Sequence, residues 1–317
     1  MTSVKTIIDL INLNNNFAIV SHTSPDGDCM GSMLGLYNSL LLLNKKVTVF
    51  LDDSVPKRLS FLKGADNIVT TPPCGKFDVV FALDCGDTKR LSFSDILLKD
   101  STVINIDHHQ SNEYYGEHNY VIPTMSSVGE MLYGILKEGG LPIDSNVATC
   151  LYTSIISDTG GFKYSNTAPS TLIVAANLLE FNIDHSKIYN RLLDEKTKEQ
   201  LKLISLATSQ IQFHFDDKLS IIYLSDEMLK ESGVDESETG DIVNLGRDID
   251  TVEVSAVIKK KTDNLFKISL RSKSYADVRY VAEHFNGGGH IRAAGCAING
   301  NIDFVIESLL YKIKEII

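Results

Sequence analysis

Four short segments of the chain place carboxylates and histidines directly after apolar runs. The residues concerned are His22, Asp26, Asp28, Asp84, Asp107, His108, His109 and Asp158. Carboxylate oxygens and imidazole nitrogens are ligands for divalent ions, and two such ions can clamp a phosphoryl group and activate water. The pattern therefore predicts a two-metal centre that cleaves phosphoesters.

The first segment runs from His22 to Asp28. Pro25 and Gly27 oppose regular structure there, so we expect its three candidate ligands on a turn between a strand and a helix. An isolated Asp-x-Asp pair is more often a helix cap, and Asp28 alone would be a good one. The interpretation as a metal site therefore depends on the other segments.

Asp84 closes a second apolar run, where a carboxylate is placed to bridge two ions. Asp87 lies two residues into the turn that follows Cys85 and suits that task less well. In the third segment the adjacent side chains of His108 and His109 should point in opposite directions, so one can ligate a metal and the other can reach a phosphate. Asp107 would orient an imidazole.

Asp158 ends a helix-like run, and a helix C-terminus disfavours negative charge. A metal partner is therefore more plausible for this carboxylate than an ordinary turn. His118 and His185 lack any comparable context, and we assign them to structural or surface positions.

A glycine-rich stretch in the last part of the chain is the second chemical feature. Gly287, Gly288 and Gly289 allow close backbone approach and present amide donors to a phosphate. His290 and Arg292 add donors, and Arg271 at a strand end offers a planar fork. A glycine run alone is usually a flexible loop, but small residues follow this one.

The pattern of elements predicts an α/β fold. Strands are expected at 17–22, 47–51, 77–85 and 103–107, and helices at 29–43, 127–137, 146–157 and 171–180. Such alternation indicates a mostly parallel sheet with helices on both faces. A long charged helical stretch at 184–212 is interpreted as a linker.

A smaller C-terminal α/β unit follows the linker. Its strands are expected at 219–224, 252–259 and 265–271, and its helices at 239–248, 278–285 and 303–316. The predicted domains are 1–183, a helical linker at 184–218, and 219–317.

Composition narrows the class of protein. The 317 residues are 43% hydrophobic and 22% charged, as in soluble globular proteins. We find no membrane-spanning run and no signal-peptide pattern, which predicts a cytoplasmic protein. Five cysteines without paired spacing give no disulfide framework. The net charge of −11 argues against a long basic groove for nucleic acid, but not against a small anionic substrate.

Together and in this order, the motifs resemble the DHH phosphoesterase superfamily with a C-terminal DHH-associated domain, specifically its NrnA-type members (oligoribonuclease and pAp phosphatase). The resemblance implies that His22, Asp26 and Asp158 hold one Mn²⁺, Asp28 and His108 hold the other, and Asp84 bridges them. It gives His109 a phosphate-facing role supported by Asp107 and Asn112. Substrate would be bound by Arg271, Gly287, Gly288, Gly289 and His290, with Arg292 as a further candidate.

The implied activity is two-metal hydrolysis of short oligoribonucleotides to mononucleotides. Hydrolysis of pAp to AMP is implied as a second activity of the same site. A homodimer is expected from the resemblance alone. The principal alternative is a phosphodiesterase for pApA or cyclic di-AMP, which would use the same site. A pyrophosphatase would need a basic tripod in its second domain, and a nuclease for long single strands a more basic surface. A non-catalytic nucleotide-binding regulator would show degenerate ligands, whereas all six are intact.

Overall fold

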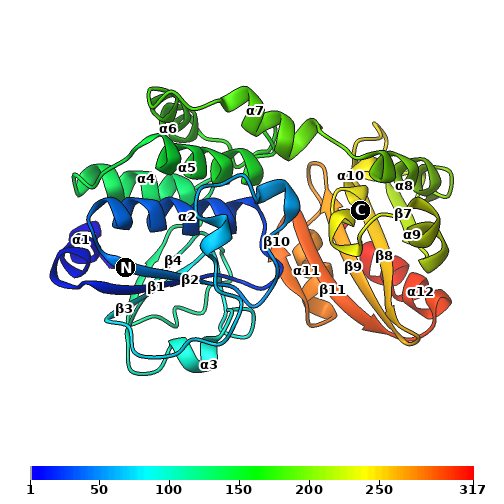
Figure 1. The fold of residues 1–317 in the computed structure, drawn as a ribbon. Helices are drawn as coiled ribbons and strands as arrows, with labels where there is room; N and C mark the ends of the chain where they lie inside the picture. The colour runs from blue at the N-terminus through cyan, green and yellow to red at the C-terminus, as the bar shows by residue number, and fades with distance from the viewer. Residues whose placement is uncertain (1) are drawn as a thin grey trace. The chain divides into compact units, whose positions relative to one another are not determined.

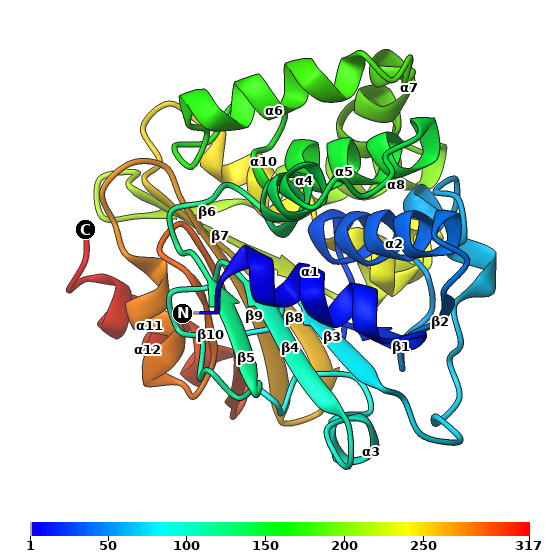
Figure 2. The ribbon, with the colours of Figure 1, turned by 90° about the vertical axis from the view of Figure 1, so that its left-hand side faces the viewer.

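The computed structural model describes residues 2–317, which form two compact units divided between Glu195 and Lys196. The first unit contains a five-stranded sheet and the second a six-stranded sheet (Figures 1 and 2). The predicted α/β class is confirmed. In the stretch expected to form a linker helix, α7 (His185–Tyr189) and a π-helical turn (Asn190–Asp194) precede the division, and α8 (Lys198–Thr208) follows it.

The sheet of the first unit is parallel throughout. Its order is β2 (Lys46–Phe50), β1 (Asn16–Val20), β3 (Val79–Leu83), β4 (Thr102–Asp107) and β5 (His118–Val121). Strands β1 to β4 match the four predicted apolar runs. The fifth strand, β5, was not predicted, because it is short, polar and buried only at its last residue.

Helices cover one face of this sheet more fully than the other. The helices of the unit, besides α7, are α1 (Val4–Leu13), α2 (Gly27–Leu42), α3 (Ser94–Leu97), α4 (Val128–Glu138), α5 (Ser145–Asp158) and α6 (Pro169–Leu179), with 3₁₀ turns at Lys57–Leu59 and Ala65–Asn67. Residues of α1, α2, α4 and α5 form the main core against Phe17, Phe81 and Ile104. On the opposite face, α3 and its flanking segments contribute Leu91 and Leu97.

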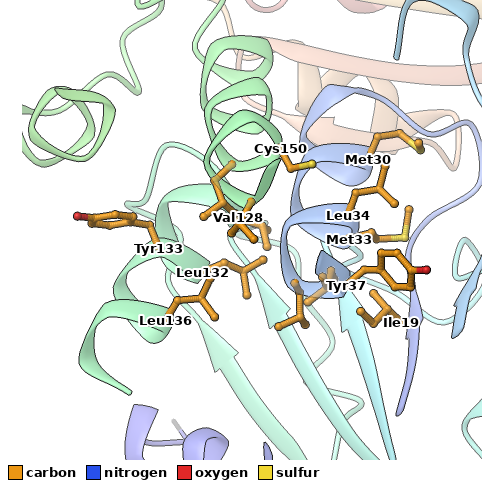
Figure 3. Packing of buried hydrophobic residues seen from close by; sticks show 14 of the residues in the cluster. Ile19, Met30, Met33, Leu34, Tyr37, Val128, Leu132, Tyr133, Leu136 and Cys150 are labelled. Carbon is orange, nitrogen blue, oxygen red and sulfur yellow. The ribbon is translucent and has the colours of Figure 1, made fainter. Parts of the chain in front are cut away.

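Helix α2 packs closely on α5 within this main core (Figure 3). A Cβ on Gly31 would lie 2.5 Å from the Cys150 carbonyl oxygen, and one on Gly27 would lie 2.3 Å from Ser157 Oγ. Only glycine allows the helix backbones to approach this closely. The approach brings the start of α2, with its carboxylates, to the end of α5, where Asp158 lies.

The second unit has a mixed sheet. Its order is β10 (Gly288–His290), β11 (Ala293–Asn299), β9 (Leu265–Ser272), β8 (Val254–Thr262), β7 (Leu219–Leu224) and β6 (Gln212–His214). Only the β7–β8 pair is parallel. Its remaining helices are α9 (Asp226–Ser232), α10 (Ile242–Arg247), α11 (Val278–His284) and α12 (Ile302–Ile313), with a 3₁₀ turn at Glu236–Thr239.

The glycine-rich stretch is not a loop but a strand. Gly288 pairs with Gly295 and His290 with Ala293, so β10 and β11 form a hairpin at the sheet edge. A Cβ on Gly289 would lie 2.5 Å from the Ala293 carbonyl oxygen, which requires glycine at this position. Among the described residues no helix combines the length and apolar character needed to cross a membrane.

Candidate metal centre

Three neighbouring strands bring most of the predicted ligands to one edge of the parallel sheet. His22 lies two residues after β1, Asp84 directly follows β3, and Asp107 is the last residue of β4. Because β1, β3 and β4 are parallel and adjacent, their carboxyl ends meet at the same edge. Open α/β sheets bind their ligands there.

One group of possible metal ligands consists of His22, Asp26 and Asp84, whose ligand atoms all lie within 4.8 Å of one another. His22 Nε2 is 3.5 Å from Asp84 Oδ2, and His22 Nδ1 is 2.8 Å from the Thr23 carbonyl oxygen. Donation of the Nδ1 proton to that carbonyl leaves the Nε2 lone pair directed at the group, as in metal-bound histidines.

Asp26, and not Asp28, is the N-cap of α2. Its Oδ1 accepts the backbone N–H groups of Asp28 and Cys29, each at 3.0 Å. Asp28 lies in the first helical turn rather than on the preceding turn. The expectation that all three candidate ligands lie outside the helix is therefore corrected for Asp28.

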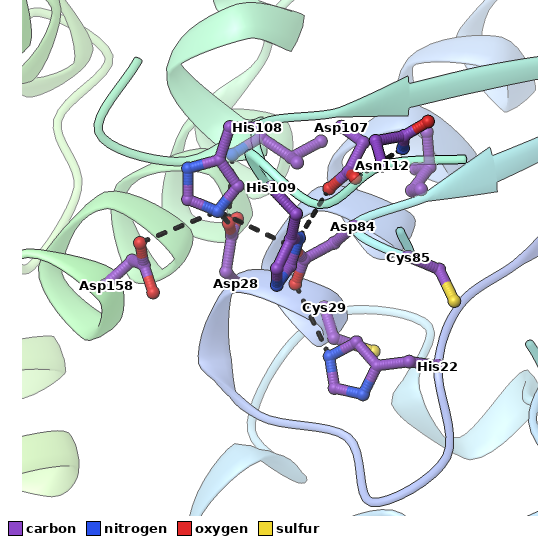
Figure 4. A network of polar contacts seen from close by, with 12 residues as sticks. His22, Asp28, Cys29, Asp84, Cys85, Asp107, His108, His109, Asn112 and Asp158 are labelled. Atoms are coloured by element: carbon purple, nitrogen blue, oxygen red, sulfur yellow. Dashed lines mark hydrogen bonds and ion pairs between the residues drawn. The ribbon is translucent and has the colours of Figure 1, made fainter. Parts of the chain in front are cut away.

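A second group consists of Asp28, His108 and Asp158, again with ligand atoms within 4.8 Å of one another. His108 Nε2 lies 3.5 Å from Asp28 Oδ2 and 3.7 Å from Asp158 Oδ2 (Figure 4). The structure thus places Asp158 with Asp28 and His108, whereas the resemblance grouped it with His22 and Asp26. The reason is the packing of α5, whose last residue is Asp158, beside both α2 and α4.

Asp84 contacts both groups. Its Oδ2 faces His22, and its Oδ1 lies 3.6 Å from His108 Nε2. Oδ1 is buried and has no hydrogen-bond partner among the described residues, which is costly for a carboxylate oxygen. The residue also adopts a left-handed backbone conformation with φ of +53°, which is unusual outside glycine. A cation between the two groups would satisfy the orphaned oxygen, so these side chains fit a divalent metal centre.

The pKa values of Asp28 and Asp158 indicate crowded negative charge. Burial and the nearby charge of Asp84 raise the pKa of Asp28. Burial likewise raises the pKa of Asp158 to about 6, and the charges of Asp26 and Asp84 contribute to the rise. For His22, burial alone would lower the pKa, but its contact with Asp84 outweighs that effect and raises the pKa to about 9. The site therefore favours bound positive charge.

Asp107 and His109 form a further group with Asp84, whose ligand atoms also lie within 4.8 Å of one another. Asp107 Oδ1 lies 2.6 Å from His109 Nδ1, and its Oδ2 accepts a hydrogen bond from Asn112 Nδ2 at 2.5 Å. The Asn112 amide also donates to Asn105 Oδ1 at 2.8 Å. Burial alone would lower the pKa of His109, but the hydrogen bond to Asp107 and the charges of Asp107 and Asp84 together outweigh burial and raise it. The bond to Asp107 orients the imidazole so that Nε2 is directed away from that carboxylate.

Two of the candidate substrate residues of the second unit, Arg271 and His290, lie in one row across its sheet. Arg271 pairs with Ala293, which pairs with His290, so all three side chains belong to the same face. Arg271 Nη1 also donates to the Leu270 carbonyl at 3.0 Å. Arg271 donates to its neighbouring residue, whereas Arg292, directly before β11, donates from Nη1 to the carbonyl of Ala276 at 2.7 Å and so ties this position to the segment before α11.

Sequence reasoning missed the residues that hold the ligands in place. Ser154 Oγ donates to Asp28 Oδ1 at 2.5 Å, while the backbone N–H of Val128 donates to Asp28 Oδ2 at 2.9 Å. One signal for Ser154 was present, since it lies four residues before Asp158 and so on the same helix face. The contact with Val128 depends on helix packing and has no local signal.

Comparison with known proteins defines the class. A model of the DHH family N-terminal domain matches residues 16–155, and a DHHA1 domain model matches residues 216–317. The chain is 30% identical over 302 residues to a protein of Thermus thermophilus named bifunctional oligoribonuclease and PAP phosphatase NrnA. That match covers 94% of this chain and 89% of the relative. The chain belongs to the DHH family.

Two further relatives agree with this assignment. A Bacillus subtilis protein of the same name is 26% identical and covers 92% of each chain. The crystal structure of an exopolyphosphatase-related protein from Bacteroides fragilis superposes with a TM-score of 0.90 at 28% identity, covering 98% of this chain and 95% of that one. The full two-unit chain is thus shared with these proteins.

Proposed function

We propose that this protein is a two-metal phosphoesterase that hydrolyses short oligoribonucleotides to mononucleotides and pAp to AMP. The observation that carries the proposal is the position of Asp84, whose two oxygens face different histidines at one edge of the sheet. The names of the NrnA relatives support the choice of substrates.

The proposed division of ligands follows the distances. His22 and Asp26 would hold one ion, Asp28, His108 and Asp158 would hold the other, and Asp84 would be shared. We propose Mn²⁺ as the native ion, because four carboxylates combined with two imidazoles suit a borderline divalent metal. When bound, two such ions supply Lewis-acid stabilisation of the phosphoryl oxygens and an activated water.

The residues of the chain supply orientation and charge. Asp107 fixes the ring of His109, and the raised pKa of His109 favours a protonated imidazole. Its Nε2–H is suited to donate to a phosphoryl oxygen, whose negative charge grows during the reaction. His109 would therefore stabilise the transition state without ligating a metal.

Recognition of the nucleotide is assigned to the second unit. Arg271 offers a planar donor fork, and His290 lies two strands away on the same sheet face. We propose that these two side chains, with the amides of Gly287, Gly288 and Gly289, bind the terminal phosphate or nucleotide. Binding a chain end would make the enzyme exo-acting.

The test is product analysis in Mn²⁺ with a panel of substrates: RNA dimers to pentamers, a long RNA, pAp, pApA, cyclic di-AMP and pyrophosphate. Release of mononucleotides from the shortest RNAs, together with pAp cleavage, is the expected result. A strong preference for pApA or cyclic di-AMP would assign the enzyme to second-messenger turnover. Inactivity on every substrate would contradict the enzymatic proposal. EDTA should abolish activity, and Mn²⁺ should restore it.

A homodimer and a cytoplasmic location stay predictions. Size-exclusion chromatography with light scattering tests the first, and cell fractionation tests the second.

A further inference from the structure

A segment without any predicted metal ligand contacts two members of the Asp28–His108–Asp158 group directly and is linked to the third, Asp158, through Asn166. This segment, Met125–Gly129, runs from the connection after β5 into the first turn of α4. The Met125 carbonyl oxygen lies 3.1 Å from His108 Nδ1 and accepts a hydrogen bond from its N–H group. That bond fixes the tautomer in which Nε2 faces the carboxylates.

The same segment positions the two acids. The backbone N–H groups of Val128 and Gly129 donate to the two oxygens of Asp28 at 2.9 and 3.3 Å. Asn166 Nδ2 donates to the carbonyl oxygens of Ser126 and Asp158, each at 3.1 Å, and so ties the end of α5 to the segment. All three ligands thus depend on the path of one short stretch of backbone.

Glu130 fixes the path of this segment through hydrogen bonds to Ser126. Its side chain is only 3% exposed, and its Oε2 accepts from Ser126 N at 3.2 Å and Ser126 Oγ at 2.6 Å. Thr171 Oγ1, at the start of α6, donates to the same oxygen at 2.9 Å. Burying a carboxylate costs free energy unless hydrogen bonds compensate for the lost hydration. Among the described residues, Glu130 belongs to none of the candidate metal groups. Its role is therefore sought in its hydrogen bonds to Ser126 and Thr171.

We propose that Glu130 is a positioning residue for the ion held by Asp28, His108 and Asp158, acting through Met125–Gly129. The inference rests on the proposed metal site. His22 and Asp26 are held differently, by the Thr23 carbonyl and by the N-terminal amides of α2. Loss of Glu130 should therefore weaken one of the two ions selectively.

The test is calorimetric titration of the metal-free full-length protein with Mn²⁺. Glu130→Leu removes the accepting oxygen Oε2 at similar size, and its affinity for one ion should fall roughly 10–100-fold while the other ion binds as in wild type. Glu130→Gln keeps one acceptor oxygen and should restore affinity to within a few-fold. Glu138→Leu, an exposed position at the end of the same helix, is the matched control and should bind both ions normally.

The outcomes separate the two levels of the proposal. Wild-type protein that binds no Mn²⁺ would overturn the metal site itself. Wild-type binding with unchanged affinities in Glu130→Leu, or with equal loss at both ions, would overturn only the role of Glu130.

A milder double variant covers the case in which Glu130→Leu fails to fold. Ser126→Ala with Thr171→Val removes both hydroxyl donors to Oε2 and leaves the carboxylate in place. A selective loss of affinity for one ion supports the proposal. Affinities equal to wild type in this folded variant contradict it. Activity that is low in micromolar Mn²⁺ and recovers in excess Mn²⁺ is the corresponding kinetic signature.

Discussion

The two sheets of this protein place their functional side chains in opposite surroundings. In the first unit the candidate ligands lie at the carboxyl edge of a parallel sheet, where Asp28 is 1% and Asp84 2% exposed, whereas Asp158 is half-buried and Asp26 is exposed. In the second unit Arg271 and His290 lie on the face of a mostly antiparallel sheet and are half-buried. The arrangement in the first unit suits hydrolysis of a phosphate that has been removed from water. The arrangement in the second unit suits binding of an anionic group from solution.

The difference has an energetic basis. Buried carboxylates disfavour the folded protein unless protons or cations neutralise them. The raised pKa values of Asp28 and Asp158 express this cost, which bound metal ions would remove. Arg271 is half-buried, and its guanidinium donates to the Leu270 carbonyl. Variants in the two regions should therefore fail in different ways.

The largest effect is expected for Asp84→Ala. Because both ions share this ligand, its loss should disrupt the coordination geometry of both. Turnover should fall roughly 1000-fold or more, since two-metal stabilisation of the transition state contributes several kcal/mol. Activity on pAp and Mn²⁺ stoichiometry are the measurements, and thermal unfolding in EDTA checks that the fold persists. Asp87→Ala is the control, because Asp87 caps the amides of Lys89 and Arg90 and should leave most activity intact. Near wild-type turnover in Asp84→Ala would contradict the shared-ligand assignment.

A smaller effect is expected for His109→Ala. Because His109 is held by Asp107 and is not in the proposed ligand set, kcat should fall roughly 100–1000-fold while two Mn²⁺ ions still bind. Steady-state kinetics and metal titration together test this. His185→Ala, at an exposed position, serves as the control. Loss of one bound ion in His109→Ala would show that this imidazole is a ligand.

Much of the first sheet could be predicted because its strands are continuous apolar runs that end in carboxylates. Buried parallel strands require such runs, so β1, β3 and β4 were visible together with the ligands that follow them. Strand β5 has no such run and forms only because β4 offers it an edge. Strand β10 likewise depends on its partner, since Gly288 and Gly289 have no intrinsic preference for a strand.

The grouping of ligands depended on distances that no local pattern contains. Asp158 lies 50 residues after His108, and it reaches that histidine because glycines such as Gly31 let α2 and α5 approach closely. The contacts that Val128 and Glu130 make are tertiary in the same sense. Residue type thus indicated which side chains carry chemistry, whereas helix packing determined which of them act together.

Arg271→Ala tests the recognition side of the comparison. Removal of charged hydrogen bonds to an anion should raise KM for pAp and RNA dimers roughly 10–100-fold with little change in kcat or Mn²⁺ binding. Arg292→Ala is the informative partner variant, because its guanidinium donates to the Ala276 carbonyl and should affect stability more than KM. An unchanged KM in Arg271→Ala would move the recognition site elsewhere.

The smallest effect concerns a buried carboxylate of the second unit that stabilises backbone instead of a ligand. Glu253 is 5% exposed, and its oxygens accept the backbone N–H groups of Ser274, Tyr275 and Ala276. Burial alone would raise the pKa of Glu253, but these hydrogen bonds outweigh it and lower the pKa below its ordinary value of 4.5. A carboxylate with a depressed pKa stabilises the fold above the unfolded-state value, and this contribution disappears as pH falls through the folded-state value.

Glu253→Gln keeps an acceptor oxygen but loses the charge, so the free energy of unfolding should fall by about 1 kcal/mol at pH 7. The difference from wild type should persist down to about pH 5 and then shrink as Glu253 itself becomes protonated in the wild-type protein. Hydrogen exchange at the amides of residues 274–276, measured across this pH range, reports the effect locally. Glu231→Gln, at an exposed position, should show no such change. A difference in the free energy of unfolding between wild type and Glu253→Gln that stays constant down to pH 3 would mean that the charge of Glu253 does not contribute to stability. In that case Glu253 would no longer contrast, as an acid stabilised by backbone amides, with the acids of the proposed metal site.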